Sequence, residues 1–158
     1  MTISDAVPHN SPLRAAFLGE GGASPALLLG IENSVNFAIG RDVSPTEAMD
    51  CADAMAVLAL PRMLEGAPNK LGTCDAVRAV LTELVDLTAR YPATADASLV
   101  VRLTYDGEHV TVSVGDMGRE LPRPEEEPGL YLVHRMAADT GQYAGDHGGR
   151  VTWAAIAV

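Results

Sequence analysis

The stretch SLVVRLTYDGEHVTVSVGD, residues 98–116, decides the fold class of this chain. Apolar residues recur at every second position on both sides of Asp106-Gly107, a dipeptide typical of tight turns between strands. A period of two indicates a strand that buries one face. The stretch therefore predicts an antiparallel hairpin. Its inward positions are Leu99, Val101, Leu103, Tyr105, Val110, Val112 and Val114.

A first amphipathic helix is predicted before the hairpin, from about Pro45 to about Leu58. Its start combines a capping serine, a proline at the first helical position and a glutamate three residues after the cap, in Ser44-Pro45-Thr46-Glu47. Pro61 is expected to disturb whatever follows. The predicted buried stripe is Ala48, Met49, Ala52, Met55 and Ala56.

A second helix is predicted after a loop at 66–72, with Thr73 or Asp75 as its cap. It ends at Tyr91-Pro92, because a residue before proline disfavours the helical conformation. Glu83, Asp86 and Arg90 lie off its apolar stripe, and Leu87 lies at the edge. The stripe consists of Val77, Val80, Leu81, Leu84 and Thr88.

The rest of the chain divides at its glycines and prolines. The prolines and acids of RELPRPEEEP predict a loop at 119–128. Residues 129–141 predict a helix that ends at Gly141. Its predicted inward residues are Leu130, Val133, Met136 and Ala137. Residues 145–149 predict a turn and 150–158 a strand. A mobile tail is expected at 1–24, and the apolar segment 25–39 is assigned to a strand, although its pattern alone does not exclude other structure.

These elements predict an α/β (α+β) two-layer sandwich, in which helices cover one face of a mixed, mostly antiparallel sheet. A chain of 158 residues suits one domain, expected at 25–158. The net charge of −10 argues against nucleic acid and anionic membranes as partners, because both are themselves negative. No apolar run long enough for a membrane span and no secretory signal is visible, so a cytoplasmic location is expected.

Metal-binding motifs are missing from the sequence. Cys51 and Cys74 form no CxxC pair, and idle thiols are the simplest interpretation. The histidines show no ligand spacing either; they are His9, His109, His134 and His147.

Several residue types that suit a nucleotide site occur in order. An aspartate at a strand end, Asp116, can accept a hydrogen bond from an exocyclic amine, and a glycine such as Gly118 lets a planar ring approach the backbone. A loop followed by a helix that starts at Gly129 offers N–H groups to phosphates. A carboxylate on a helix across the pocket, such as Glu83, could orient a nucleophile or a metal.

The order of these elements and motifs over residues 45–158 resembles the histidine-kinase/gyrase-type ATPase fold, and specifically the small anti-sigma-factor serine kinases of bacteria. The stretches that carry the resemblance are TELVDLTARY (82–91), VSVGDMG (112–118) and GLYLVHRMAADTGQYAGDHGGRVTWAAI (129–156). The resemblance implies that Asp116, Gly118, Gly129 and Leu130 bind the nucleotide and that Glu83 is the general base. It also implies ATP and magnesium as cofactors.

The chain departs from this family at the magnesium site. The family's asparagine, one helical turn after the glutamate, is Leu87 here, and leucine has no lone pair for a metal. Asp86 is a possible substitute, although it lies about 100° away around the helix. The loop before Gly129 reads PEEEP, and its glutamates would repel a triphosphate.

The favoured hypothesis is a cytoplasmic regulator of the anti-sigma kinase-like type that works by protein–protein interaction and binds ATP weakly or not at all. Its expected partner is a sigma factor or an anti-sigma antagonist, and a homodimer is possible. One alternative is an active ATP-dependent serine/threonine protein kinase. The other is an unrelated α/β interaction domain whose motifs match by chance.

Overall fold

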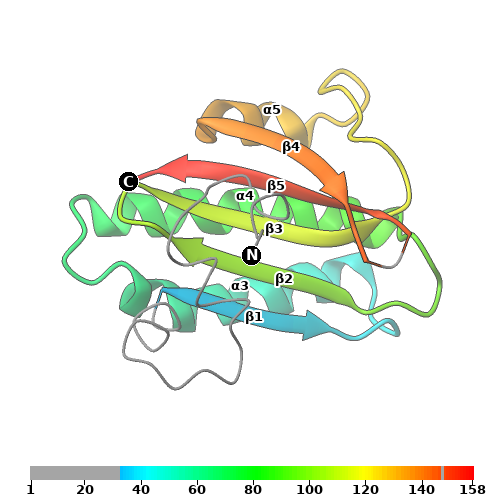
Figure 1. The fold of residues 1–158 in the computed structure, drawn as a ribbon, viewed down its shortest axis with the longest axis horizontal. Coiled ribbons are helices and arrows are strands. Elements are labelled where there is room, and N and C mark those ends of the chain that lie inside the picture. Colours follow the sequence, from blue (N-terminus) through cyan, green and yellow to red (C-terminus); the bar gives the residue numbers. More distant parts are fainter. Residues whose placement is uncertain (1–32, 147) are drawn as a thin grey trace, which may run out of the picture.

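Five strands form one antiparallel sheet, and helices cover one face of it (Figure 1). The computed structural model describes residues 33–146 and 148–158. In chain order its elements are β1 (Ser34–Ile39), α3 (Pro45–Met63), α4 (Lys70–Arg90), β2 (Leu99–Tyr105), β3 (His109–Met117), α5 (Gly129–Met136), β4 (Asp139–Ala144) and β5 (Arg150–Ala157).

The sheet order is β1-β2-β3-β5-β4. Every neighbouring pair of these described strands is antiparallel, so the sheet is simpler than the mixed one expected. The α+β two-layer sandwich is confirmed. The predicted tail at 1–24 and residues 25–32 of the predicted first strand lie outside the described residues.

The hairpin predicted from residues 98–116 is formed by β2 and β3. Val101 pairs with Val114 and Tyr105 with Val110, so the loop between the strands is longer than the Asp106-Gly107 dipeptide. Gly107 takes a φ of 98°, which favours glycine, and the Asp106 carboxylate accepts two backbone N–H groups at 2.9 and 2.7 Å. The turn therefore forms where its dipeptide predicted it.

The predicted start of α3 is correct and its predicted end is wrong. Ser44 Oγ accepts from the Glu47 N–H at 3.2 Å, and Glu47 Oε2 accepts from the Ser44 N–H at 2.7 Å, which completes a capping box. The helix continues through Pro61 to Met63. Because Leu60 and Met63 are buried, their packing offsets the hydrogen bond that the proline cannot donate. On the predicted stripe the three alanines are buried and the two methionines are partly exposed.

Helix α4 begins earlier than predicted. Its first residue is Lys70, Asn69 precedes it in a left-handed conformation without a side-chain cap, and Thr73 is buried inside the helix. Neither Thr73 nor Asp75 is the cap. The predicted stripe is confirmed in full, because Val77, Val80, Leu81, Leu84 and Thr88 are all buried.

The helix predicted at 129–141 is half helix and half strand. Helix α5 ends at Met136, whose side chain is exposed, and Ala137 is already extended. Gly141 lies in β4 instead of ending a helix. The Thr140 hydroxyl donates to the Trp153 carbonyl at 2.8 Å, and β4 pairs with β5 along its length. Pairing with the next strand, across the turn at 145–149, thus outweighs the helical pattern.

Helix α4 is central to the helix layer, where it packs against α3, α5 and the middle strands β3 and β5. The sheet side of this core is apolar and consists of Ile39, Leu99, Val101, Leu103, Val110, Val112, Val114, Met117, Ala154 and Ile156. Within residues 33–146 and 148–158, none of the helices combines the length and apolar content that crossing a bilayer requires.

Candidate functional site

The predicted site residues gather around the end of β3, the last two turns of α4 and the start of α5. The sheet register shifts between Val114 and Met117, so the pairing of β3 with β5 is irregular around Asp116. There the Asp116 carbonyl accepts from the Ala93 N–H at 3.1 Å, and the Gly118 N–H donates to the Tyr91 carbonyl at 2.7 Å. These bonds join the end of β3 to the chain that leaves α4.

The glycines around Asp116 are required by close contacts. A Cβ on Gly145 would overlap the Asp116 carboxyl group, and a Cβ on Gly149 would stand 2.6 Å from the Asp116 Cβ and 2.8 Å from the Met117 carbonyl oxygen. A Cβ on Gly118 would stand 2.8 Å from the Pro92 carbonyl oxygen. Two glycines of the turn between β4 and β5, Gly145 and Gly149, therefore lie against Asp116, a contact that the sequence analysis did not predict.

Glu83 lies beside Gly129, because a Cβ on that glycine would overlap the Glu83 carboxylate. Burial raises the pKa of the Glu83 carboxyl, and the charges of Asp86 and Glu127 raise it further, against the opposing effect of Arg90. The structure thus brings together the predicted base and the predicted start of the phosphate-binding helix.

Leu87 belongs to the hydrophobic core, with 3% of its surface exposed. Asp86, the possible substitute ligand, accepts a hydrogen bond from Arg90 Nε at 3.0 Å. Its carboxylate is therefore turned along α4 toward an arginine. Among the described residues no group of three or more histidine, cysteine, aspartate or glutamate side chains is arranged to hold a metal ion.

The guanidinium group of Arg90 connects the acidic loop at 119–128 to the end of α4. Arg90 donates to both carboxylate oxygens of Glu127, at 3.0 and 2.8 Å, and the Tyr91 hydroxyl donates to the same carboxylate at 3.3 Å. The Arg119 guanidinium lies 4.8 Å from the centre of the Tyr91 ring. We call Arg90, Tyr91, Arg119 and Glu127 the Arg90 cluster.

Within the Arg90 cluster, Glu127 is largely shielded from solvent and bound to a cation, unlike a solvated acid on a loop. Its side chain is 16% exposed, and the hydrogen bonds from Arg90 lower the pKa of its carboxyl group. Sequence reasoning did not predict the cluster, since Arg90 and Glu127 are far apart in the chain and a run of glutamates is typical of a solvated surface.

The start of α5 has fewer N–H groups to offer than the sequence suggested. Leu130 N–H donates to the Glu127 carbonyl at 2.9 Å, and Tyr131 N–H donates to the Pro128 carbonyl at 3.0 Å. The Leu130 side chain is buried in the core. Leu130 therefore has a structural role in this conformation.

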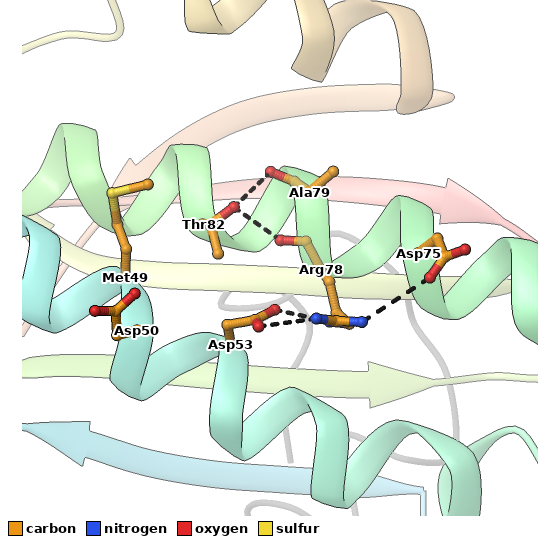
Figure 2. Close-up of a pocket in the computed structure, with 7 residues that line it drawn as sticks. All are labelled: Met49, Asp50, Asp53, Asp75, Arg78, Ala79 and Thr82. Atoms are coloured by element: carbon orange, nitrogen blue, oxygen red, sulfur yellow. Dashed lines mark hydrogen bonds and ion pairs between the residues drawn. The ribbon is translucent and has the colours of Figure 1, made fainter.

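A second polar site, which the sequence did not predict, lies between the outer faces of α3 and α4 (Figure 2). Arg78 donates to both carboxylate oxygens of Asp53, at 2.7 and 2.9 Å, which lowers the pKa of the Asp53 carboxyl. Asp75 lies 4.0 Å from the same guanidinium, and Thr82 Oγ1 donates to the Arg78 carbonyl at 3.0 Å. Asp50 also lines the hollow, so three carboxylates surround the guanidinium of Arg78, and the Arg78–Asp53 pair links α4 to α3.

Comparison with known proteins adds no assignment: no protein-family model matches the chain, and no curated protein matches its sequence significantly.

Proposed function

We propose that this chain is a cytoplasmic bacterial regulator of the anti-sigma kinase-like type that acts by binding another protein and binds ATP weakly or not at all. Its partner is a sigma factor or an anti-sigma antagonist. The proposal combines the sequence resemblance with the arrangement of three elements: the end of β3, helix α4 and the start of α5.

The burial of Leu87 is the observation that carries this proposal. In the resembling family the residue at this position is an asparagine that holds magnesium. Here the side chain is apolar and faces the core, so neither its chemistry nor its direction suits a cation. Without magnesium, the charge of a triphosphate would have to be neutralised by the protein alone.

The charges around Glu83 support the same conclusion. Asp86, Glu127 and Glu83 itself place three carboxylates near the start of α5, and Arg90 is engaged by two of them. A phosphate group placed here would meet net negative charge and would compete with Glu127 for the arginine. Weak binding of anionic nucleotides is therefore expected.

A second candidate function is ATP-dependent transfer of phosphate to a serine or threonine. It is favoured by the close approach of Gly145 and Gly149 to Asp116, which suits an adenine-reading aspartate. It is favoured too by the position of Glu83 beside Gly129, since a carboxylate with a raised pKa suits a general base.

Calorimetric titration with ATP, with and without magnesium, separates the two candidates. Asp116→Ala tests the adenine contact, and Asp50→Ala, an exposed acid on α3, is the matched control. Weak or absent binding that magnesium does not strengthen supports the proposal. Tight, magnesium-dependent binding that only Asp116→Ala abolishes would overturn it in favour of the kinase.

The partner is tested separately, with purified sigma factors and anti-sigma antagonists and an optical binding assay. Saturable binding to one of them supports the regulatory function whatever the outcome with ATP. If the chain binds neither nucleotide nor any of these proteins, the remaining hypothesis is an unrelated α/β interaction domain.

A further inference from the structure

Helix α3 has a second apolar face, which is turned away from the core. Residues 54–61, AMAVLALP, contain only apolar side chains. The inner face of the helix is buried and consists of Ala48, Ala52, Ala56, Leu60 and Met63. The outer face is exposed, and its apolar side chains recur at steps of three and four residues, at Cys51, Ala54, Leu58 and Pro61. A helix that is apolar all round is typical of one that is covered on every side.

The outer face includes large side chains that stand in water. Leu58 is 75% exposed, and Val57 beside it is 46% exposed. Helix α3 packs against α4 and β1, and no helix or strand within 33–146 and 148–158 covers Leu58. Large aliphatic side chains gain free energy when a partner removes them from water. The outer face of α3 therefore has the composition of a contact surface.

The spacing of the outer face matches a seam between two helices. Positions 51, 54, 58 and 61 follow the three-and-four spacing of the a and d positions in a coiled coil, where each side chain inserts between side chains of the facing helix. We call these four residues the α3 seam. Its neighbours on the helix surface are Asp50, Met55, Val57 and Arg62. The face thus fits another helix laid along α3.

The α3 seam is symmetric about position 56. In an antiparallel pair of α3 helices centred there, position 51 of one copy faces position 61 of the other, and Ala54 faces Leu58. A small side chain then leaves room for a large one on both sides of the two-fold axis. A parallel pair would instead set Leu58 against Leu58 and Ala54 against Ala54. The seam is therefore complementary to an antiparallel copy of itself.

The charges near the two ends of α3 favour the same arrangement. The amino-terminal half of the helix carries only acids, at Glu47, Asp50 and Asp53. Around its other end lie two cations and one acid, which are Arg62, Lys70 and Glu65. An antiparallel copy brings the acidic half of one helix to the more basic end of the other, whereas a parallel copy brings acids to acids.

We propose that two copies of this chain associate through their α3 seams, packed antiparallel about a two-fold axis near position 56. The occupant of the outer face is thus a second copy, and both copies use the same patch. The rival occupant is a helix of a different protein. This association depends neither on ATP nor on the regulatory partner proposed above.

Sedimentation equilibrium tests the association, and the unaltered chain is expected at twice its mass of 16.5 kDa. The test variant, Leu58→Gln, changes an exposed side chain, and circular dichroism checks that it is folded. The matched control is Leu71→Gln, the same change at a leucine that is 80% exposed on α4. Leu58→Gln should raise the dissociation constant of the dimer about tenfold or more, and Leu71→Gln should leave it unchanged.

Two results of this experiment would overturn the proposal. One is a monomer at the highest soluble concentration of the unaltered chain, which would leave the face to a different protein. The other is a dimer that Leu58→Gln leaves intact or that Leu71→Gln weakens as much, since the copies would then meet through another surface.

Cross-linking tests the antiparallel arrangement and does not require Leu58→Gln to fold. Cys51→Ser and Cys74→Ser remove the native thiols, and Val57→Cys or Thr46→Cys then gives each copy one thiol. In the proposed pair the two Val57 positions are offset by about 3 Å along the helices, whereas the two Thr46 positions are about 30 Å apart. A short bismaleimide should therefore join two chains through Val57→Cys and not through Thr46→Cys. Joining through Thr46→Cys, or through neither position, would contradict the proposal.

Discussion

Leu87 lies one helical turn after Glu83 in the candidate site, and its side chain packs in the core. Its side chain is a member of the hydrophobic core, and under the proposed function it stands where a metal ligand would be expected. A polar residue cannot simply be restored at this position, because its amide would be buried without a hydrogen-bond partner.

We expect Leu87→Ala to lower the free energy of unfolding by about 2–5 kcal/mol, through lost burial and a cavity. Leu87→Asn should be destabilising as well and should not confer magnesium-dependent ATP binding. Urea denaturation and calorimetry measure both effects. Leu87→Met is the control, with an expected cost below about 1.5 kcal/mol. A stable Leu87→Asn variant that binds ATP with magnesium would mean that this position is poised for a metal after all.

Glu83 is expected to make folding less favourable when it is ionised. Because its pKa is raised in the folded chain, its contribution is most favourable below the ordinary value of 4.5 and is lost as the pH rises through the folded value. Glu83→Gln should therefore increase stability at neutral pH, and the gain should shrink as the pH falls through the raised pKa of folded Glu83 and be lost below about 4.5.

Denaturant titrations of Glu83→Gln between neutral and acidic pH check this sign. Glu65→Gln, at an exposed acid beyond the end of α3, is the control and should give nearly the same stability as the unaltered chain throughout. A loss of stability at neutral pH in Glu83→Gln would show that the carboxylate is held by a favourable contact.

At the scale of elements, the Arg90 cluster holds the loop at 119–128 against the end of α4. Its hydrogen bonds link a helix to a loop that has little apolar contact of its own, apart from buried Pro122 and half-buried Leu121. Gln142 on β4 also binds the loop, accepting from the Leu121 N–H at 2.8 Å and donating to the Arg119 carbonyl at 3.3 Å, so the position of the loop depends on charge, and so on pH, only at the Arg90 cluster.

We expect a double-mutant cycle of Arg90→Ala and Glu127→Ala to give a coupling on the order of 1 kcal/mol at neutral pH. The pKa of Glu127 is lowered, so this stabilisation is present above the ordinary value of 4.5 and is lost as the pH falls through the folded value. Hydrogen exchange across residues 119–128 should become faster in either single variant.

The same loop supplies the control pair. Arg123 and Glu126 are 3.6 Å apart with side chains 80% and 51% exposed, and their coupling should be close to zero. Equal coupling in the two pairs would mean that the Arg90 contacts contribute no more than an ordinary surface ion pair.

At the scale of the whole molecule, the net charge of −10 acts against compaction. Screening by salt should therefore raise the melting temperature between low ionic strength and about 0.5 M sodium chloride. Thermal denaturation at several salt concentrations measures this. A fall in melting temperature would show that ion pairs such as Arg78–Asp53 outweigh the general repulsion.

The α+β class, the hairpin of β2 and β3, the capping box of α3 and the buried stripe of α4 followed from the sequence alone. Each depends on residues close together in the chain, so period, turn chemistry and capping suffice to predict it. The leucine at position 87, in a helix that otherwise carries acids off its apolar stripe, was visible in the sequence as well. That Glu83 and Gly129 lie together agrees with the order of the motifs.

What only the tertiary structure decided depends on contacts that a segment makes with other segments, whether the next strand or a part distant in the chain. Residues 139–144 became a strand because β5 offered an unpaired edge, and α3 passed through Pro61 because Leu60 and Met63 are buried beneath it. Arg90 at the end of α4 binds Glu127 in the loop before α5, and Arg78 on α4 binds Asp53 on α3. No local pattern encodes such pairs, since their energy appears only when the fold brings the groups together and removes them from water.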